Sequence, residues 1–294
     1  MTAAAAQSAM WPRSSRETTD RSIGAILVDA GKLSVANVEK ILHLQKTESL
    51  RFGDAALQLG LLDPDDIQLA LATQYEYPYL LKGESKVSRE LTAAYDPFSQ
   101  EVEHLRALRS QLTLRLLGGD RAPRALAICS PDRGEGRSRL AANLAVVFSQ
   151  LGEHTLLIDA DLRHSRQHDL FGMNNATGLS SVLSGRGGPE SIHRVPDFVD
   201  LSILTAGPLP PNPQELLGRP LFYKLLQELS DEFDVVLIDT PAGHFADAQI
   251  IASRAGAALL VARLNKSVLP RVQRMSTSLQ QSGAAVVGSV LGRF

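Results

Sequence analysis

The sequence contains a single cysteine, Cys129, among its 294 residues. One cysteine cannot close an internal disulfide, which excludes the small disulfide-stabilised secreted domains and fits a reducing compartment. The most apolar stretches, 257–264 and 284–291, fall well short of the roughly 20 residues that a membrane-spanning helix requires. No charged start followed by an apolar core is visible at the N-terminus, so no export signal is recognised. We therefore expect a soluble cytoplasmic protein.

An excess of charge of one sign is also lacking, because 30 basic residues stand against 32 acidic residues and leave a net charge of −2. Without a basic excess there is no overall field to hold a nucleic-acid backbone, so we expect no nucleic-acid partner. Glycine and proline, at 22 and 15 residues, are ordinary in number, which excludes collagen-like and disordered chains.

Residues 22–45 and 51–74 form an internal repeat. In each copy a short helical pattern ends at a glycine, Gly31 or Gly60, and an N-cap candidate then opens a second amphipathic helix. Two such helix pairs can bury their apolar faces against each other. The predicted domains are a flexible tail over 1–20, a helical repeat domain over 21–81, a linker over 82–100 and a larger domain over 101–294.

From residue 101 onward, short β-rich runs alternate with helical patterns. Continuous apolar strands separated by helices are typical of a mostly parallel sheet with helices on both faces, so we predict an α/β fold. The predicted strands are 125–130, 155–161, 201–206, 234–239, 257–264 and 286–291, and the predicted helices are 137–151, 212–231, 246–255 and 268–282.

The first of these strands runs into a glycine-containing turn, residues 131–138, and then into a helix. Gly134 and Gly136 let the backbone curl so that its N–H groups point inward, which is how phosphate is held at the start of a helix. Ser138 supplies a hydroxyl suited to Mg²⁺. Arg137 stands where a P-loop carries lysine, so the turn alone is equally compatible with an ordinary connection.

Three carboxylates follow apolar strands of the predicted sheet: Asp159 and Asp161 after one strand, and Asp239 after another. Because ligands of parallel α/β sheets sit beyond the carboxyl ends of the strands, these acids and the glycine turn are expected to share one crevice. Together they predict a site for a nucleoside triphosphate with Mg²⁺. The alternative is that the acids only cap the helices that follow them.

The segment from about 95 to 294 resembles the bacterial tyrosine kinases, in particular the soluble kinases of exopolysaccharide chain-length-determinant systems. GEGRS is similar to their Walker A motif, LLIDADLR to their second acidic motif (Walker A′) and VVLIDTP to their Walker B motif. The resemblance implies a P-loop NTPase fold of the Mrp/MinD type and ATP-dependent phosphorylation of tyrosine. The residues it places at the ATP phosphates are Arg133, Gly134, Glu135, Gly136, Arg137, Ser138 and Arg139.

The same resemblance implies roles for the acids. Ser138, Asp159 and Asp239 would hold Mg²⁺, and Asp161 would accept the proton of the tyrosyl hydroxyl, with Arg137 as the second catalytic residue. A planar guanidinium is not equivalent to the ammonium of the family's lysine. Two alternatives therefore stay open: an ATPase of the ParA/MinD kind that assembles in response to nucleotide, and a degenerate nucleotide-binding regulatory subunit.

The resemblance also implies partners. Glu103, Arg106 and Arg109 look like the family's subunit-interface motif, through which identical kinase domains join in a ring, and their spacing puts them on one helix face. A solvated charge stripe would have the same spacing. The membrane-embedded polysaccharide chain-length regulator would be a separate chain, which would recruit this protein to the inner face of the cell membrane.

The repeat resembles the N-terminal domain of pilus-assembly and type II secretion ATPases, in which paired segments of this form bind cyclic di-GMP. Arg51, Gly53 and Gln74 match that pattern in the second copy, whereas Ser22 stands where the first copy would carry arginine. A helical docking module whose glycines are helix caps is an equally good interpretation.

Overall fold

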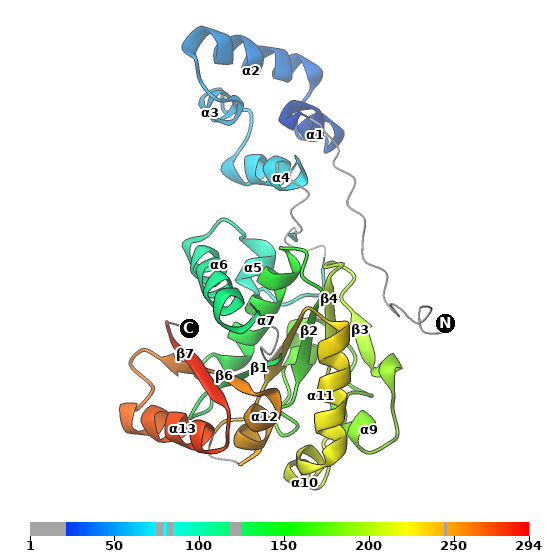
Figure 1. Ribbon diagram of the computed structural model, residues 1–294. Helices are drawn as coiled ribbons and strands as arrows, with labels where there is room; N and C mark the ends of the chain where they lie inside the picture. Colours follow the sequence, from blue (N-terminus) through cyan, green and yellow to red (C-terminus); the bar gives the residue numbers. More distant parts are fainter. Residues whose placement is uncertain (1–21, 75–78, 81–84, 118–124, 244–245, 294) are drawn as a thin grey trace, which may run out of the picture. The chain divides into compact units, whose positions relative to one another are not determined.

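A computed structural model describes residues 22–74, 79–80, 85–117, 125–243 and 246–293. The tail predicted over residues 1–20 lies outside these ranges. The chain divides into two compact units, one ending at Tyr79 and the other beginning at Leu80 (Figure 1). No helix in the described ranges is long and apolar enough to cross a membrane.

The first unit consists of four short helices. They are α1 (Ile23–Asp29), α2 (Val35–Glu48), α3 (Phe52–Gln58) and α4 (Pro64–Gln74). Helix α1 packs on α4 and α2 packs on α3, so each helix of one repeat contacts a helix of the other. Leu27 and Ile41 are fully buried at the centre of this packing. The repeat is therefore the structural unit of a small helical core.

Gly31, Gly53 and Gly60 of the repeat each have a local structural reason. Gly31 and Gly60 follow α1 and α3 with φ of +69° and +62°, a conformation that glycine adopts without strain. Within α3, Gly53 faces Ile67 of α4 so closely that a β-carbon would press on its side chain. The glycine pattern is thus accounted for by helix ends and close helix packing.

The second unit is built on a seven-stranded sheet of order β3-β4-β2-β5-β1-β6-β7. All neighbouring strands are parallel except the edge pair β3 and β4. The strands are β1 (Ala125–Cys129), β2 (Thr155–Asp159), β3 (Ile192–Arg194), β4 (Leu201–Leu204), β5 (Val235–Asp239), β6 (Ala257–Arg263) and β7 (Ala285–Gly292). The predicted mostly parallel α/β fold is confirmed.

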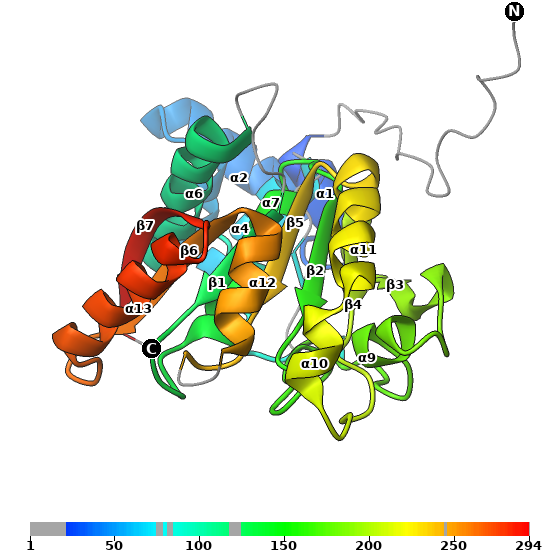
Figure 2. The same cartoon turned by 60° about the horizontal axis from the view of Figure 1, so that its bottom comes forward.

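Helices cover both faces of this sheet (Figures 1 and 2). On one face lie α5 (Thr92–Tyr95), α6 (Gln100–Leu112) with a π-helical turn (Thr113–Leu117), and α7 (Arg137–Ser149). On the other lie α9 (Leu179–Leu183), α10 (Pro213–Gly218), α11 (Pro220–Glu232), α12 (Asp247–Ala255) and α13 (Leu269–Gln281). Two short helices, α8 (Gln167–Leu170) and a 3₁₀ turn (Pro189–Ser191), connect strands. Because successive residues of the central strands alternate between the two cores, these strands are apolar throughout.

Several parts of the chain differ from the sequence-based expectation. The helix predicted over 212–231 is interrupted at Arg219, because Pro220 opens a second helix with its fixed φ. The three-residue strand β3 was not predicted. Leu91, Ala93 and Ala94, which were placed in a linker, are fully buried in the core beneath α7.

Candidate active site

The site lies at the carboxyl edge of the sheet, where β1, β2 and β5 end. Asp159 and Asp239 are the last residues of β2 and β5, and they are direct neighbours in the strand register. The glycine turn leaves β1 at the same edge and opens α7. The structure therefore brings the glycine turn and these two acids together at one edge of the sheet, as the sequence predicts.

The turn has the curled backbone that the sequence predicts. Gly134 and Gly136 have φ of +73° and +87°, and Gly136 is the N-cap of α7. Inside the turn the Glu135 side chain is buried, and its carboxylate accepts the backbone N–H of Asp132 at 2.7 Å. Glu135 thus braces the turn from within, and its carboxylate points to other protein groups.

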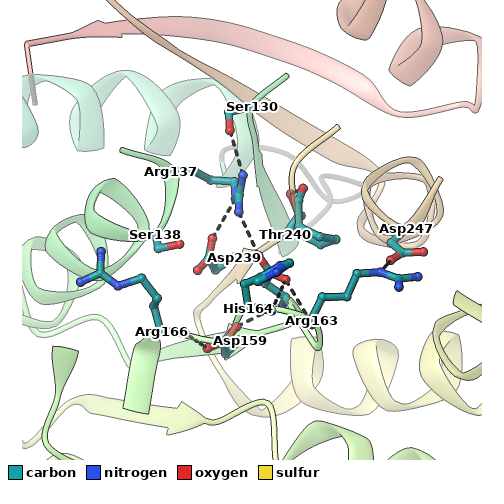
Figure 3. A network of polar contacts seen from close by, with 12 residues as sticks. Ser130, Arg137, Ser138, Asp159, Arg163, His164, Arg166, Asp239, Thr240 and Asp247 are labelled. Carbon is teal, nitrogen blue, oxygen red and sulfur yellow. Dashed lines mark hydrogen bonds and ion pairs between the residues drawn. The ribbon is translucent and has the colours of Figure 1, made fainter. Parts of the chain in front are cut away.

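Arg137 is buried and contacts three groups (Figure 3). Its Nη1 donates to Ser130 Oγ at 2.8 Å, its Nε to Asp239 Oδ1 at 3.2 Å and its Nη2 to Asp161 Oδ2 at 3.1 Å. All the partners of this guanidinium are buried as well. The cation at the Walker lysine position is therefore engaged by the acids of the site.

Asp159 and Asp239 form a buried pair of like charges. Burial, with Asp239 beside it, raises the pKa of Asp159 well above its usual range. Burial also raises the pKa of Asp239, against the opposing effect of Arg137. Two buried carboxylates at neighbouring strand ends are a site that favours an added cation.

The acids also shape the backbone that follows β2. Asp159 accepts backbone N–H groups from Asp161, Arg166 and Gln167, at 3.2, 3.0 and 2.9 Å. Asp161 Oδ1 accepts those of Arg163 and His164. The alternative was that the acids only cap the helices that follow them. Asp159 does accept N–H groups at the start of α8, but the acids also cluster at the sheet edge.

Gln167 is a central residue that the sequence did not identify. It is fully buried, and its Nε2 donates to Asp239 Oδ2 at 2.8 Å and to the Ser138 carbonyl at 3.1 Å. Its Oε1 is buried without a hydrogen-bond partner among the described residues. Gln167 joins the glycine turn to both acidic strand ends, a role that no motif spacing signals.

A cavity of about 380 Å³ opens beside the turn. It is lined by residues 133–139 together with Asp161, His164, Arg166, Glu90 and Arg263. Arg139, which was predicted at the phosphates, lines this cavity and donates to Glu101 and to the Glu90 carbonyl. Arg133 is exposed at the mouth.

A further buried acid lies at the edge of this network. Asp247, the first residue of α12, is fully buried and accepts from Arg163 Nε at 2.8 Å (Figure 3). Its other oxygen, Oδ1, has no hydrogen-bond partner among the described residues. Arg163, the last residue of the second acidic motif, is thereby tied to α12.

The predicted interface residues lie on α6. Arg106 is paired with Glu103 on the same helix, whereas Arg109 donates to the Val147 carbonyl of α7 at 2.8 Å. The predicted cyclic di-GMP residues lie in the helical unit: Arg51 is exposed at the start of α3, Gly53 is inside it and Gln74 ends α4.

Comparisons with known proteins agree with this geometry. Residues 126–272 match the family model described as ATPase MipZ. The tyrosine-protein kinase YwqD of Bacillus subtilis is 35% identical over 208 residues, which cover 70% of this chain and 87% of YwqD. This chain belongs to the bacterial tyrosine-protein kinase family. The membership confirms the predicted resemblance and implies the use of ATP and Mg²⁺.

Solved structures place the α/β unit in the same family. The kinase domain of the Escherichia coli tyrosine kinase ETK has a TM-score of 0.67 and 30% identity, covering 74% of this chain and 85% of that domain. The cell division ATPase MinD of Pyrococcus furiosus has a TM-score of 0.52 and 28% identity, covering 58% of this chain and 73% of MinD. The predicted P-loop NTPase fold of the Mrp/MinD type is confirmed.

Some relatives are much longer than this chain. The tyrosine-protein kinase wzc of Salmonella typhimurium is 35% identical over 203 residues, which are 69% of this chain but only 28% of wzc. The kinase family is thus shared, whereas the remainder of wzc has no counterpart in the match.

Proposed function

We propose that this chain is an ATP-dependent protein tyrosine kinase whose catalytic centre is the carboxyl edge of β1, β2 and β5. One observation carries the proposal: the glycine turn, Asp161 and Asp239 are joined in a single buried hydrogen-bonded network. In this family's chemistry, positioning and electrostatic stabilisation do most of the catalytic work, and such a network supplies both.

The donor set fits Mg²⁺ together with a triphosphate. The described residues contain no group of three or more His, Cys, Asp or Glu arranged to hold a metal ion by themselves. Mg²⁺ is commonly bound by one or two carboxylates together with substrate phosphates, and Asp239 with the Ser138 hydroxyl offers that partial set. Bound Mg²⁺ would neutralise phosphate charge during transfer. Asp159 is the neighbour of Asp239 in the strand register, and it accepts backbone N–H groups of the connection that follows β2.

Asp161 would receive the proton of the attacking tyrosine. As the tyrosyl oxygen bonds to the γ-phosphorus and the bond to ADP breaks, the hydroxyl proton passes to a carboxylate oxygen. Oδ1 of Asp161 already accepts two backbone N–H groups, so the free acceptor is Oδ2. That atom is held by Arg137. Catalysis therefore requires the guanidinium to release Asp161 Oδ2 when nucleotide and tyrosine are bound.

The same contact supports a second candidate, the degenerate nucleotide-binding subunit. If Arg137 stays on the two carboxylates when nucleotide binds, both the base and the metal ligand remain engaged and turnover fails. A third outcome, ATP hydrolysis without transfer to protein, would match an ATPase that assembles in response to nucleotide.

Transfer of label from γ-labelled ATP onto tyrosine separates the three. We expect phosphotyrosine on the chain or on a tyrosine copolymer, and its loss in Asp161→Asn. The matched control is Asp231→Asn, an exposed aspartate of α11. Hydrolysis without phosphotyrosine would support the assembly ATPase, and binding without hydrolysis the degenerate subunit. Of the chain's five tyrosines, Tyr75 and Tyr77 lie outside the described residues, and Tyr223 is 43% exposed.

The wider role follows from the family resemblance. The kinase would act on exopolysaccharide chain length or export, in contact with a separate membrane-embedded chain-length regulator at the inner face of the membrane. Self-association into a ring would use the exposed part of α6 around Glu103 and Arg106. Pull-down with the regulator's cytoplasmic segment, and the oligomeric mass of Glu103→Ala, test these two contacts.

Cyclic di-GMP binding to the helical unit remains a hypothesis without support from the relatives described above. The glycines of the repeat already have structural reasons, which favours the docking module. Isothermal titration decides between them: heat of binding that disappears in Arg51→Ala would support the dinucleotide, and no heat with the unaltered protein would remove it.

A further inference from the structure

The segment between β6 and α13 is fastened to the glycine turn by side chains. Arg263 Nη1 and Lys266 Nζ each donate to the Gly134 carbonyl oxygen at 3.0 Å. Ser267 donates to the Glu135 carboxylate, and Arg271 pairs with Asp132 at 2.8 Å. Two cations thus share one backbone acceptor on the phosphate-holding turn.

These two cations lack compensating charge within the part of the chain that the structure describes. Both nitrogen atoms lie 3.0 Å from one oxygen, so they are at most about 6 Å apart and repel each other. The two acids of the turn are engaged elsewhere: Asp132 with Arg271, and Glu135 with Ser267 and a backbone N–H. An anion beside the turn would relieve the repulsion.

Lys266 lies directly against the turn. A β-carbon at Gly134 would collide with its Nζ, so glycine at 134 admits the ammonium as well as the positive φ. Lys266 is exposed, and Arg263 is half-buried and lines the cavity beside the turn. Arg263 is therefore accessible to a ligand that enters this cavity, and Lys266 is open to solvent where it bonds to Gly134, a residue of the cavity wall.

Arg137 cannot supply this charge from where it lies, because it contacts Asp161 and Asp239. We propose that Arg263 and Lys266 are the cations that bind the polyphosphate of the nucleotide in this chain, in place of a Walker lysine. This inference rests on the proposed function, because it assumes that the chain binds a nucleotide. The positive charge beside the turn then comes from Arg263 and Lys266, whereas Arg137 pairs with the carboxylates.

Nucleotide titrations test this. ATP and AMP are titrated with Mg²⁺ into the full chain and into Arg263→Met, Lys266→Met and the double variant. The matched control is Arg274→Met, which removes an exposed arginine of α13. We expect each single variant to weaken ATP binding about tenfold and the double variant about a hundredfold. AMP carries a single phosphate, so its affinity should change less than about threefold. Arg274→Met should leave both affinities unchanged.

The inference would be overturned if the Arg263 and Lys266 variants bound ATP as tightly as Arg274→Met does. It would also be overturned if the variants lost affinity for ATP and for AMP equally. Thermal unfolding without nucleotide checks that the variants fold. Where a methionine variant does not, Lys266→Gln and Arg263→Gln keep a side-chain N–H for the Gly134 carbonyl and lose only the charge. If ATP binding depends on Arg263 and Lys266 but tyrosine is not phosphorylated, only the proposed kinase function is contradicted. Absence of ATP binding by the unaltered chain would overturn both.

Discussion

Replacing Arg137 tests whether its guanidinium neutralises the acids that it contacts, Asp161 and Asp239. Arg137→Met keeps the length of the side chain and removes the cation that contacts Asp239 and Asp161. These carboxylates are 0% and 4% exposed, so water cannot take the place of the lost partner. Breaking a buried ion pair by removing one partner costs about 3–5 kcal/mol. Arg137→Lys keeps one charge but loses most of the three-way bonding, so we expect a cost of about 1–2 kcal/mol.

Urea unfolding in the absence of nucleotide and Mg²⁺ measures these costs, with far-UV circular dichroism as the signal. The helical unit is identical in all variants, so differences in the transition report on the α/β unit. The cycle of Arg137→Met, Asp161→Asn and the double variant isolates the pair, and we expect a coupling of about 1–3 kcal/mol.

The cost should also depend on pH. Arg137 opposes the rise in the pKa of Asp239 that burial causes, so its removal should raise that pKa further. A carboxyl group whose pKa is raised in the folded state holds its proton more tightly there than in the unfolded chain. Stability then falls as pH rises from the ordinary carboxyl pKa of about 3.9 through the raised value. The deficit of Arg137→Met should therefore shrink as the pH is lowered from neutrality towards 5. A variant as stable as the unaltered protein at neutral pH, or a deficit that grows on acidification, would refute the neutralising role of Arg137.

Three further outcomes are expected. Gln167→Leu removes the donor to Asp239 and to the Ser138 carbonyl, so it should destabilise the α/β unit by about 1–3 kcal/mol in urea unfolding; an unchanged midpoint would contradict this. Burial raises the pKa of Cys129 to about 11, so about one thiol in a thousand is ionised at pH 8. Alkylation of Cys129 should therefore proceed only in denaturant, and fast labelling of the folded chain would contradict this. Gly60→Ala places a β-carbon at φ +62° and should destabilise the helical unit by about 1 kcal/mol, measured by thermal unfolding; a rise in melting temperature would show that the residue tolerates another conformation.

The sheet was predictable because its strands are buried on both faces. Runs such as those of β2 and β5 are apolar without interruption, and each ends at an acid, which gives both the element and its direction. Strand β3 offers no such signal. It has three residues at the edge and pairs with one neighbour only, so its assignment depends on β4 and not on its own pattern.

The convergence of the site residues was predictable from topology, whereas their bonding was not. Parallel strands bring their carboxyl ends to one edge, which placed Asp159, Asp239 and the glycine turn together. Which atoms pair there depends on side-chain reach. Arg139 follows the turn directly and bonds to Glu101 and Glu90. Gln167 comes from a connection without a motif, yet it contacts Asp239.

Arginine in place of the P-loop lysine changes which groups of the site the cation at position 137 pairs with. A lysine ammonium is a point charge that suits a single anionic group, whereas a guanidinium presents several donors in a fixed plane. Arg137 uses three of its nitrogen atoms on Ser130, Asp161 and Asp239, which a lysine could not contact at once. Asp161 and Asp239 are thereby neutralised from inside the turn. Phosphate must then compete with two carboxylates for this cation, and that competition is weaker if Arg263 and Lys266 already carry the phosphate charge. The two arrangements depend on each other: a chain that commits its Walker cation to the acids needs its phosphate-binding charge from another element.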